Sequence, residues 1–275
     1  MSYKTKSILF WIFAIIFTIS IAVYQKMTGP TYPKKGKTVI AEKEVKFKLL
    51  RSAENTKDAI ISIENSSKLY SGSIVYKRFN TLDDWTEIQM TQNGDKLEGS
   101  LPAQPAAGKL MYRVFLKYGN ENYALNINPV VIRFKGNVPL YILFPHILLM
   151  FLAMLFSTRT GIEAIIDGKN TYKYALITVI TLFLGGIVLG PIVQKYAFGA
   201  FWTGWPLGKD LTDNKTVIAF LFWIMATYKI YRNREKTGLA IVAMVILLAI
   251  YLIPHSMFGS ELDYNSGKVT TGQKI

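Results

Sequence analysis

Five apolar runs constrain the fold of this chain more than any other feature. The hydrocarbon core of a membrane is roughly 30 Å thick, and a helix needs about 20 residues to cross it. The mean hydropathy of the 275 residues is +0.24, higher than is usual for a soluble domain. The sequence therefore predicts a membrane protein with five transmembrane helices. The runs are Ile8–Tyr24, Leu140–Phe156, Tyr174–Val193, Val217–Tyr231 and Leu239–Ile253.

The first run is compatible with a signal peptide or with a membrane anchor, because Lys4 and Lys6 precede it. The run is long for a signal peptide. The residues Ala22-Val23-Tyr24-Gln25 at its end also lack the small-x-small pattern of a cleavage site. We therefore expect residues 1–25 to remain as an N-terminal transmembrane anchor.

Basic residues between the runs predict the orientation, because Lys and Arg are enriched in cytoplasmic loops. One such loop, after the second run, holds Arg159, Lys169 and Lys173, and a denser cluster lies at Lys229–Lys236. With the N-terminus and these loops in the cytoplasm, we expect a multi-pass protein of the bacterial inner membrane. The segments that this arrangement places on the periplasmic side are residues 26–137, 194–216 and 256–275.

Residues 26–137 are polar and show the alternation of apolar and polar side chains that is typical of β-strands. Val45–Leu49 and Leu110–Leu116 are clear examples, and turn signals such as Asn93-Gly94-Asp95 separate the runs. Seven or eight short strands at this spacing predict a β-sandwich. We expect Trp85 to pack in or near its core.

The predicted fold class is thus an α+β membrane protein, with five transmembrane helices and an extracytoplasmic β-sandwich inserted between helices 1 and 2. The segment Leu101–Tyr112 resembles the run-in to a fibronectin type III or immunoglobulin-like strand that carries a tyrosine corner. This resemblance implies an Ig-like sandwich. Residues 138–255 form a four-helix domain with a Trp-rich outer loop at 194–216, and residues 256–275 form an extracytoplasmic tail.

The composition excludes several kinds of site. The chain has no cysteine, so it lacks disulfides, thiolate metal sites, iron–sulfur clusters, thiol nucleophiles and covalently attached haem. It has two histidines, so any histidine chemistry uses His146, His255 or both. The net charge of +14 is consistent with a nucleic-acid binder, but the basic loops beside membrane segments explain it better. We expect no nucleic-acid partner.

Both histidines follow a proline, at Pro145-His146 and Pro254-His255, and the predicted spans place them at similar depth near the outer surface. Ionisable groups in a span usually face the interior of the bundle and have a partner there. One interpretation is that each imidazole satisfies a hydrogen bond while its proline bends the helix. The other is that the two imidazoles are axial ligands of one haem b.

The outer loop Gln194–Thr216 is unusually rich in aromatic residues and glycine, with Trp202 and Trp205 at its centre. It is consistent with an aromatic belt at the lipid headgroups, or with a shelf that stacks on a flat ligand. Small residues in the third run, Gly185-Gly186 and Gly190, leave room either for a macrocycle or for ordinary helix packing.

This loop resembles the tryptophan-rich WWD segment of bacterial haem-handling proteins of cytochrome c maturation, in which histidines of flanking outer regions ligate haem. The residues in comparable order are Gly199, Trp202, Trp205, Asp210 and Thr212, with His146 and His255 on either side. The chain departs from that family because it has no Trp-Trp-Asp triplet and has fewer spans. The resemblance implies a haem-binding role for the two histidines and the two tryptophans.

The sequence therefore predicts an integral membrane protein that binds one haem b between its helices near the outer face, for haem handling or electron transfer. His146 and His255 would ligate the iron, and Trp202 and Trp205 would cover the haem. The alternative is a non-enzymatic accessory protein of a membrane complex, whose β-domain binds a periplasmic partner. Enzyme activity is not expected, and we find no internal repeat of the kind that transporters show. A cation site is a further possibility at a group of outer residues, His255, Glu261, Asp263, Asp210 and Asp213.

Overall fold

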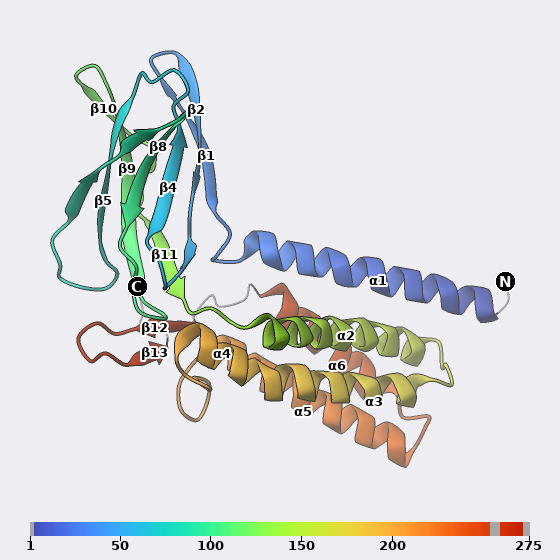
Figure 1. Cartoon of the computed structure of the whole chain (residues 1–275). Coiled ribbons are helices and arrows are strands. Elements are labelled where there is room, and N and C mark those ends of the chain that lie inside the picture. Colours follow the sequence, from blue (N-terminus) through green and yellow to red (C-terminus); the bar gives the residue numbers. More distant parts are fainter. Residues whose placement is uncertain (1–2, 254–258, 272–275) are drawn as a thin grey trace.

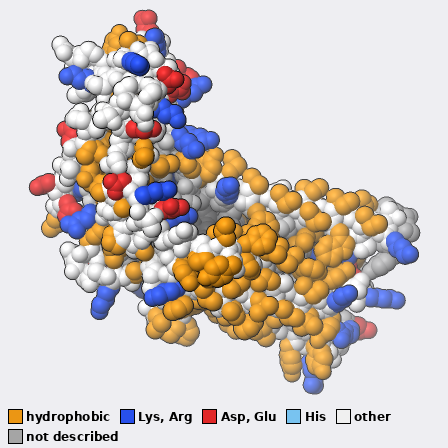
Figure 2. All heavy atoms as spheres, viewed as in Figure 1, with side chains coloured by type: hydrophobic (Ala, Val, Ile, Leu, Met, Phe, Trp, Pro, Cys, Tyr) orange, Lys and Arg blue, Asp and Glu red, His pale blue; other side chains and the backbone are white. Residues whose placement is uncertain are grey.

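The computed structural model describes residues 3–253 and 259–271, and it shows a bundle of helices beside a domain of β-strands (Figure 1). The helices run side by side, and the β-domain lies at the end where α1 finishes and α2 begins. Apolar side chains cover the helices, whereas charged side chains are frequent on the β-domain (Figure 2). The helical elements are α1 (Tyr3–Thr28), α2 (Leu140–Ile165), α3 (Thr171–Leu182), the π-helical segment η1 (Phe183–Leu189), α4 (Gly190–Phe198), α5 (Leu211–Arg232) and α6 (Gly238–Leu252).

Three helices are long and apolar enough to cross a membrane: Lys4–Thr28, Leu140–Ile165 and the continuous helix Thr171–Phe198, which joins α3, η1 and α4. The fourth and fifth predicted spans form α5 and α6, which do not reach the same length and apolarity. α6 has 15 residues, equivalent to about 23 Å of helix. α5 is longer but begins and ends with charged residues. Of the five predicted runs, three thus form helices with the length and apolarity that a membrane span requires.

Small side chains hold the bundle together. Its core contains a series of alanines with no exposed surface, packed around Trp223, Leu182 and Leu247. Alanine lets helix backbones approach closely, which is how helices associate where lipid removes the hydrophobic driving force. These alanines are Ala153, Ala175, Ala219, Ala226, Ala240 and Ala243.

The cytoplasmic loop predicted around Arg159 is shorter than expected, because α2 continues to Ile165. Arg159 is therefore a helix residue. Its side chain is completely buried and forms an ion pair of 2.5 Å with Glu163, one turn later. The rings of Phe10, Trp11 and Tyr174 surround its guanidinium at 5.1–5.8 Å. The sequence predicted a loop residue here, but the structure shows a buried ion pair within a helix.

The β-domain contains two sheets that share one core. In the larger sheet the strand order is β3-β11-β9-β5-β6, with β10 also paired to β9, and β3 runs parallel to β11. The smaller sheet has the order β4-β8-β7, and β1 and β2 form a separate antiparallel hairpin. The strands are β1 (Lys34–Ile40), β2 (Lys43–Leu49), β3 (Ser52–Glu54), β4 (Ala59–Glu64), β5 (Ser71–Arg78), β6 (Thr86–Gln89), β7 (Thr91–Asn93), β8 (Lys96–Leu101), β9 (Lys109–Tyr118), β10 (Glu121–Ala124) and β11 (Val130–Lys135).

The alternation of buried and exposed side chains along the strands explains how this core forms. In β9, the side chains of Leu110, Tyr112, Val114 and Leu116 are buried while the residues between them are partly exposed. They meet apolar residues of both sheets and of the β1–β2 hairpin. The predicted β-structure of residues 26–137 is therefore observed, since every second side chain faces one shared core.

Two details of the Ig-like interpretation do not fit. Tyr112 is buried, but its hydroxyl donates to the carbonyl of Leu50 at 2.8 Å, 62 positions earlier in the chain. A tyrosine corner instead bonds to the backbone a few residues upstream. Trp85, expected in or near the core, is 42% exposed in the segment before β6. Its ring is not part of the core cluster and instead lies beneath the cationic groups of Lys77 and Arg113, at 5.6 and 5.7 Å.

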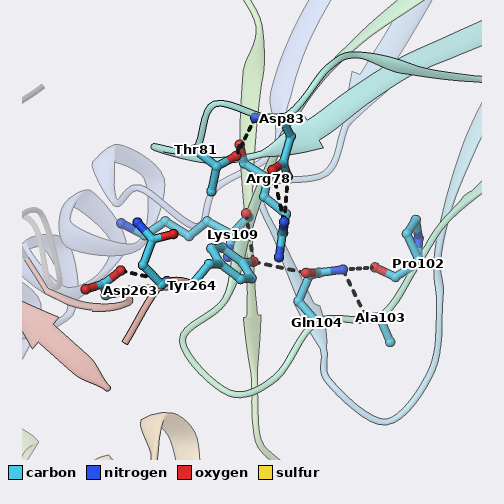
Figure 3. A network of polar contacts seen from close by, with 10 residues as sticks. Arg78, Thr81, Asp83, Pro102, Ala103, Gln104, Lys109, Asp263 and Tyr264 are labelled. Carbon is cyan, nitrogen blue, oxygen red and sulfur yellow. Dashed lines mark hydrogen bonds and ion pairs between the residues drawn. The ribbon is translucent and has the colours of Figure 1, made fainter. Parts of the chain in front are cut away.

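A C-terminal hairpin, β12 (Ser260–Leu262) and β13 (Val269–Thr271), joins the β-domain to the outer loop of the helical domain. On the β-domain side, the Tyr264 hydroxyl bonds to the backbone of Lys109 and to Gln104, next to the Arg78–Asp83 pair (Figure 3). Glu261 pairs with Lys109 at 2.5 Å, and both side chains are nearly buried. On the other side, Thr271 accepts from the backbone N–H of Lys209 at 2.8 Å. The segment predicted as a tail is therefore a connector.

A glycine allows the end of β11 to approach α4. The backbone N–H of Gly136 donates to the carbonyl of Ala197 at 2.9 Å. A Cβ at this position would lie only 2.1 Å from the carbonyl oxygen of Tyr196, so any other residue would force the two segments apart.

Candidate functional site

A cavity of about 290 Å³ lies in the helical domain, between α1, α2, η1, α4, α5 and α6. Its size is at the lower end of the range for small-molecule sites, roughly 300–1,000 Å³. Its composition, mostly apolar with a few polar groups, is also that of such sites. The apolar wall includes Met150, Phe151, Met154, Leu182, Leu247 and Ile250. The polar lining residues include His146, Gln194, Asp210, Asp213, Lys215 and Thr216.

The polar residues come from the helix ends that lie nearest the β-domain. His146 is in the second turn of α2, Gln194 is near the end of α4, and Asp210 caps the start of α5. Met154, later than His146 in α2, and Leu182, earlier than Gln194 in the helix Thr171–Phe198, lie farther from the β-domain. The cavity is therefore amphipathic along the helix direction, with its polar part at the end nearest the β-domain.

His146 is held by a hydrogen bond to the backbone of the neighbouring helix. Its Nδ1 lies 2.9 Å from the carbonyl oxygen of Gly185. A carbonyl can only accept, so in the neutral imidazole the proton is on Nδ1 and Nε2 keeps its lone pair. Metal-ligating histidines are commonly oriented in this way, by a carbonyl that accepts from the other ring nitrogen. His146 lines the cavity, and this tautomer leaves the lone pair of its Nε2 for a ligand.

The partner of His146 belongs to the π-helical segment η1. A π-helix closes its hydrogen bonds over five residues rather than four, and such segments often occur at functional sites. Gly185 also lets η1 approach α2, since a Cβ there would lie 2.9 Å from Cβ of Leu149. A Cβ on Gly190 would lie 4.0 Å from Cε1 of His146, which places this glycine beside the imidazole. The run of glycines in the third span thus accommodates the histidine, and the backbone there provides its partner.

Two buried carboxylates meet at Thr203, where the outer loop returns to the bundle. The backbone N–H of Thr203 donates to Oδ2 of Asp213 at 2.8 Å, and its hydroxyl lies 3.2 Å from Oδ2 of Asp210. Asp210 also accepts from the N–H of Thr212 at 2.8 Å, which caps α5. The exposed fractions of Asp210 and Asp213 are 4% and 8%. These bonds order the loop over the outer end of the cavity.

Burial raises the pKa of the Asp213 carboxyl, and the negative charge of Asp210 adds to the effect. Gln194 compensates in part, because its amide nitrogen can lie 2.9 Å from Asp213 while its oxygen accepts from the Thr203 hydroxyl at 2.5 Å. The polar end therefore combines two acidic groups with a neutral amide.

Two basic side chains also lie near the polar end of the cavity. Lys215 is 6% exposed, lines the cavity and donates to the carbonyl of Ile253 at 3.1 Å. Arg133, on β11, stacks over the ring of Phe198 at 5.4 Å. Burial lowers the pKa of Arg133, and the nearby Asp210 and Glu261 oppose that effect. The β-domain thus contributes a positive charge close to Asp210 and Glu261.

The structure separates the two tryptophans of the predicted aromatic cover. Trp202 lines the cavity, and its indole N–H donates to the carbonyl of Trp205 at 3.1 Å. The side chain of Trp205 is 77% exposed and lies outside the cavity lining. Of the four predicted site residues, His146 and Trp202 thus share one cavity, and His255 lies outside the described residues.

The residues predicted to form the alternative cation site bond to different partners. Glu261 bonds to Lys109 and Asn80 of the β-domain, and Asp263 bonds within the turn of its own hairpin. Over residues 3–253 and 259–271, no group of three or more His, Asp or Glu is arranged to hold a metal ion.

Sequence reasoning did not identify Gln194, Thr203 or Lys215 as site residues. The position of Lys215 just before an apolar run could have indicated a role, because a charge at the end of a span usually has a partner. Thr203 gave no signal, because its role depends on how the loop folds back. Comparison of the chain with protein-family models, with curated proteins and with solved structures found no match.

Proposed function

We propose that this protein is a membrane-embedded binding protein that holds one amphipathic cofactor in the cavity, with haem b as the specific candidate. The observation that carries the proposal is His146. Its Nδ1 is fixed by Gly185, so its Nε2 is a lone-pair donor at the wall of a cavity between helices. The protein would then serve in haem handling or in electron transfer.

The residues fit such a cofactor in three ways. His146 would ligate the iron, and Trp202 provides an aromatic surface at the outer end. The wall of Met150, Phe151 and Met154 suits an apolar body. Bound haem would supply one-electron chemistry at its iron. This chain would orient the group and exclude water.

The proposal also includes the finer topology. α5 and α6 join the other helices in the membrane, the N-terminus and the α5–α6 connection are cytoplasmic, and the β-domain is periplasmic. The distribution of basic residues supports this orientation.

The test is an absorption spectrum of the purified full-length protein, before and after addition of haemin. We expect a Soret band, and we expect His146→Ala to reduce or shift it because one axial ligand is lost. Trp202→Ala should weaken haem retention less, since stacking is a secondary contribution. Trp205→Ala is the matched control, because that side chain is exposed and should leave the spectrum unchanged. We expect His255→Ala to act like His146→Ala.

Absence of a Soret band after haemin addition, or a band that His146→Ala leaves unchanged, would contradict the haem assignment. Mass spectrometry of lipophilic compounds that co-purify with the protein tests the broader claim. A compound lost with a bulky change such as Gly186→Leu, which fills the cavity wall, would support a different amphipathic ligand.

A second function follows from the C-terminal hairpin. Because Tyr264, Glu261 and Thr271 fix the β-domain to the outer loop, the molecule presents a defined surface rather than two loosely linked parts. That observation favours an accessory protein that holds a partner of a membrane complex. Without haem binding, this becomes our proposed function.

A further inference from the structure

The hairpin of β1 and β2 presents lysines to its outer face in opposed pairs. The segment Lys34–Lys48 contains six lysines and two glutamates. In the register of the hairpin, Lys35 lies directly opposite Lys48, and Lys37 directly opposite Lys46. We call these four residues the lysine ladder. The two pairs are separated by Gly36 and Phe47, which face the other way.

All four ladder side chains point away from the protein core. Ile40, Val45 and Leu49 are buried in the core of the β-domain, so side chains of opposite parity in these strands face outward. The outward positions also include Glu44, which pairs with Lys37 at 2.8 Å and Lys46 at 3.6 Å. Even so, the side chains of Lys37 and Lys46 are 71% and 79% exposed. The ladder therefore has a clear excess of accessible positive charge.

This arrangement lowers the stability of the isolated hairpin. Like charges directly opposite each other on one face of a sheet repel. Solubility or protection of an exposed edge requires only scattered charges, and alternating signs would supply them without repulsion. The four ladder lysines also line the rim of a shallow groove, together with Ser62 and with Gly36 and Phe47 of the opposite face. Opposed lysines beside a groove are suited to a surface of many negative charges.

The position of the hairpin indicates which surface this is. Figure 1 shows the strands running across the direction of the helices, with β1 and β2 on the side of the β-domain from which α1 extends. Lys and Arg side chains gather along that side in Figure 2. Since α1 is long and apolar enough to cross a membrane, a bilayer around α1 would have one surface on this side of the β-domain.

We propose that the lysine ladder docks on anionic phospholipid headgroups of that surface and holds the β-domain against it. Its charge is complementary to such headgroups, and each lysine near an anionic surface changes the ratio of docked to undocked hairpin by about five-fold. The interaction weakens with salt, because the charges are exposed. This inference is independent of the cavity and of which leaflet is cytoplasmic.

The chain has no cysteine, so a single probe can be placed at will. Val39 is 65% exposed and shares the outward face of the ladder, so Val39→Cys carries an environment-sensitive fluorophore. The full-length protein is reconstituted in vesicles of phosphatidylcholine, alone or with phosphatidylglycerol, that contain a lipid spin-labelled at its headgroup. Leu82→Cys, fully exposed in the β5–β6 loop, is the control position.

We expect stronger quenching at Val39→Cys when phosphatidylglycerol is present, and no such dependence at Leu82→Cys. Replacing the four ladder lysines with Gln, or adding high salt, should remove the dependence. The matched control replaces four exposed lysines elsewhere in the β-domain with Gln, and should retain it. These control positions are Lys57, Lys68, Lys96 and Lys117.

Equal quenching in both kinds of vesicle, or an unchanged lipid dependence in the ladder variant, would overturn the proposal. A probe that ignores the lipid composition but responds to added polyphosphate would also overturn it, and would identify a soluble polyanion as the occupant instead.

Discussion

At the scale of single residues, the buried acidic pair beside Thr203 dominates the chemistry of the outer loop. Asp213 is retained in its place by the backbone of Thr203 and by Gln194, although burial favours its neutral form. The folded protein therefore binds a proton at Asp213 more tightly than the unfolded chain does. Between the two pKa values, stability falls as the pH rises.

We expect the unfolding temperature of the wild type to rise, relative to that of Asp213→Asn, as the pH falls from neutral through the raised pKa of Asp213. At neutral pH the charged form carries its full burial cost, so Asp213→Asn should be neutral or stabilising there. Asp210 is present in both proteins, so its own titration largely cancels. Thermal unfolding in detergent at several pH values measures the difference.

Asp263→Asn provides the control, because hydrogen bonds from Ser266 and Asn265 lower the pKa of Asp263. Its contribution to stability is present above its ordinary pKa and is lost as the pH falls, opposite to that of Asp213. If the difference between wild type and Asp213→Asn did not change with pH, burial of this carboxyl would have no energetic consequence.

At the scale of elements, α2 carries an ion pair inside the bundle. Arg159 and Glu163 are one turn apart and completely buried, and Glu163 also accepts from the backbone N–H of Asn170 at 3.2 Å. Removing one partner of a buried pair leaves an uncompensated charge. The pair therefore links the C-terminal end of α2 to the start of α3.

We expect Arg159→Met to destabilise the protein by about 3–5 kcal/mol, because the buried ion pair is lost while the Glu163 carboxylate stays buried. The double variant Arg159→Met/Glu163→Gln should recover most of that loss, since no buried charge remains and the acceptor for Asn170 is kept. A double-mutant cycle of unfolding in detergent measures the coupling. Equal losses in the single and double variants would show that packing of the arginine, rather than charge, is what matters.

The same elements show what the sequence could and could not predict. Apolar runs and strict alternation indicated the long helices and the β-strands, because those patterns depend on local geometry alone. The end of α2 was misjudged, since a basic residue followed by polar residues indicates a loop unless its partner is one turn away. The buried environment of Arg159 depends on Phe10 and Trp11 of a different helix.

The candidate site was predictable to a similar extent. His146 and Trp202 were identified because rare residue types stand out in apolar or Gly-rich segments. Other contacts of the site join separate elements, so no local sequence pattern indicates them. These are the hydrogen bond from His146 to Gly185 and the contacts of Asp213 with Thr203 and Gln194. The exposure of Trp205 likewise depends on how its loop folds back.

At the scale of the whole molecule, the orientation in the membrane is the next property to establish. We expect Asn93→Cys to react with a membrane-impermeant maleimide in intact cells. Glu235→Cys, in the α5–α6 connection, should react only after the membrane is opened. Both positions are exposed. Labelling of both from the same side would rule out the proposed arrangement of α5, and reversed labelling would invert the protein.

The C-terminal hairpin also determines the order in which the molecule can assemble. Glu261 contacts Lys109 and Asn80 across 152 and 181 positions of sequence, and α6 lies between those partners along the chain. Contacts of such high contact order form late in folding, after the chain entropy of closing a long loop has been overcome. The β-domain and the bundle must therefore each acquire their shape before the hairpin joins them, and the contacts of Thr203 with Ser260 and of Lys209 with Thr271 form in that last step.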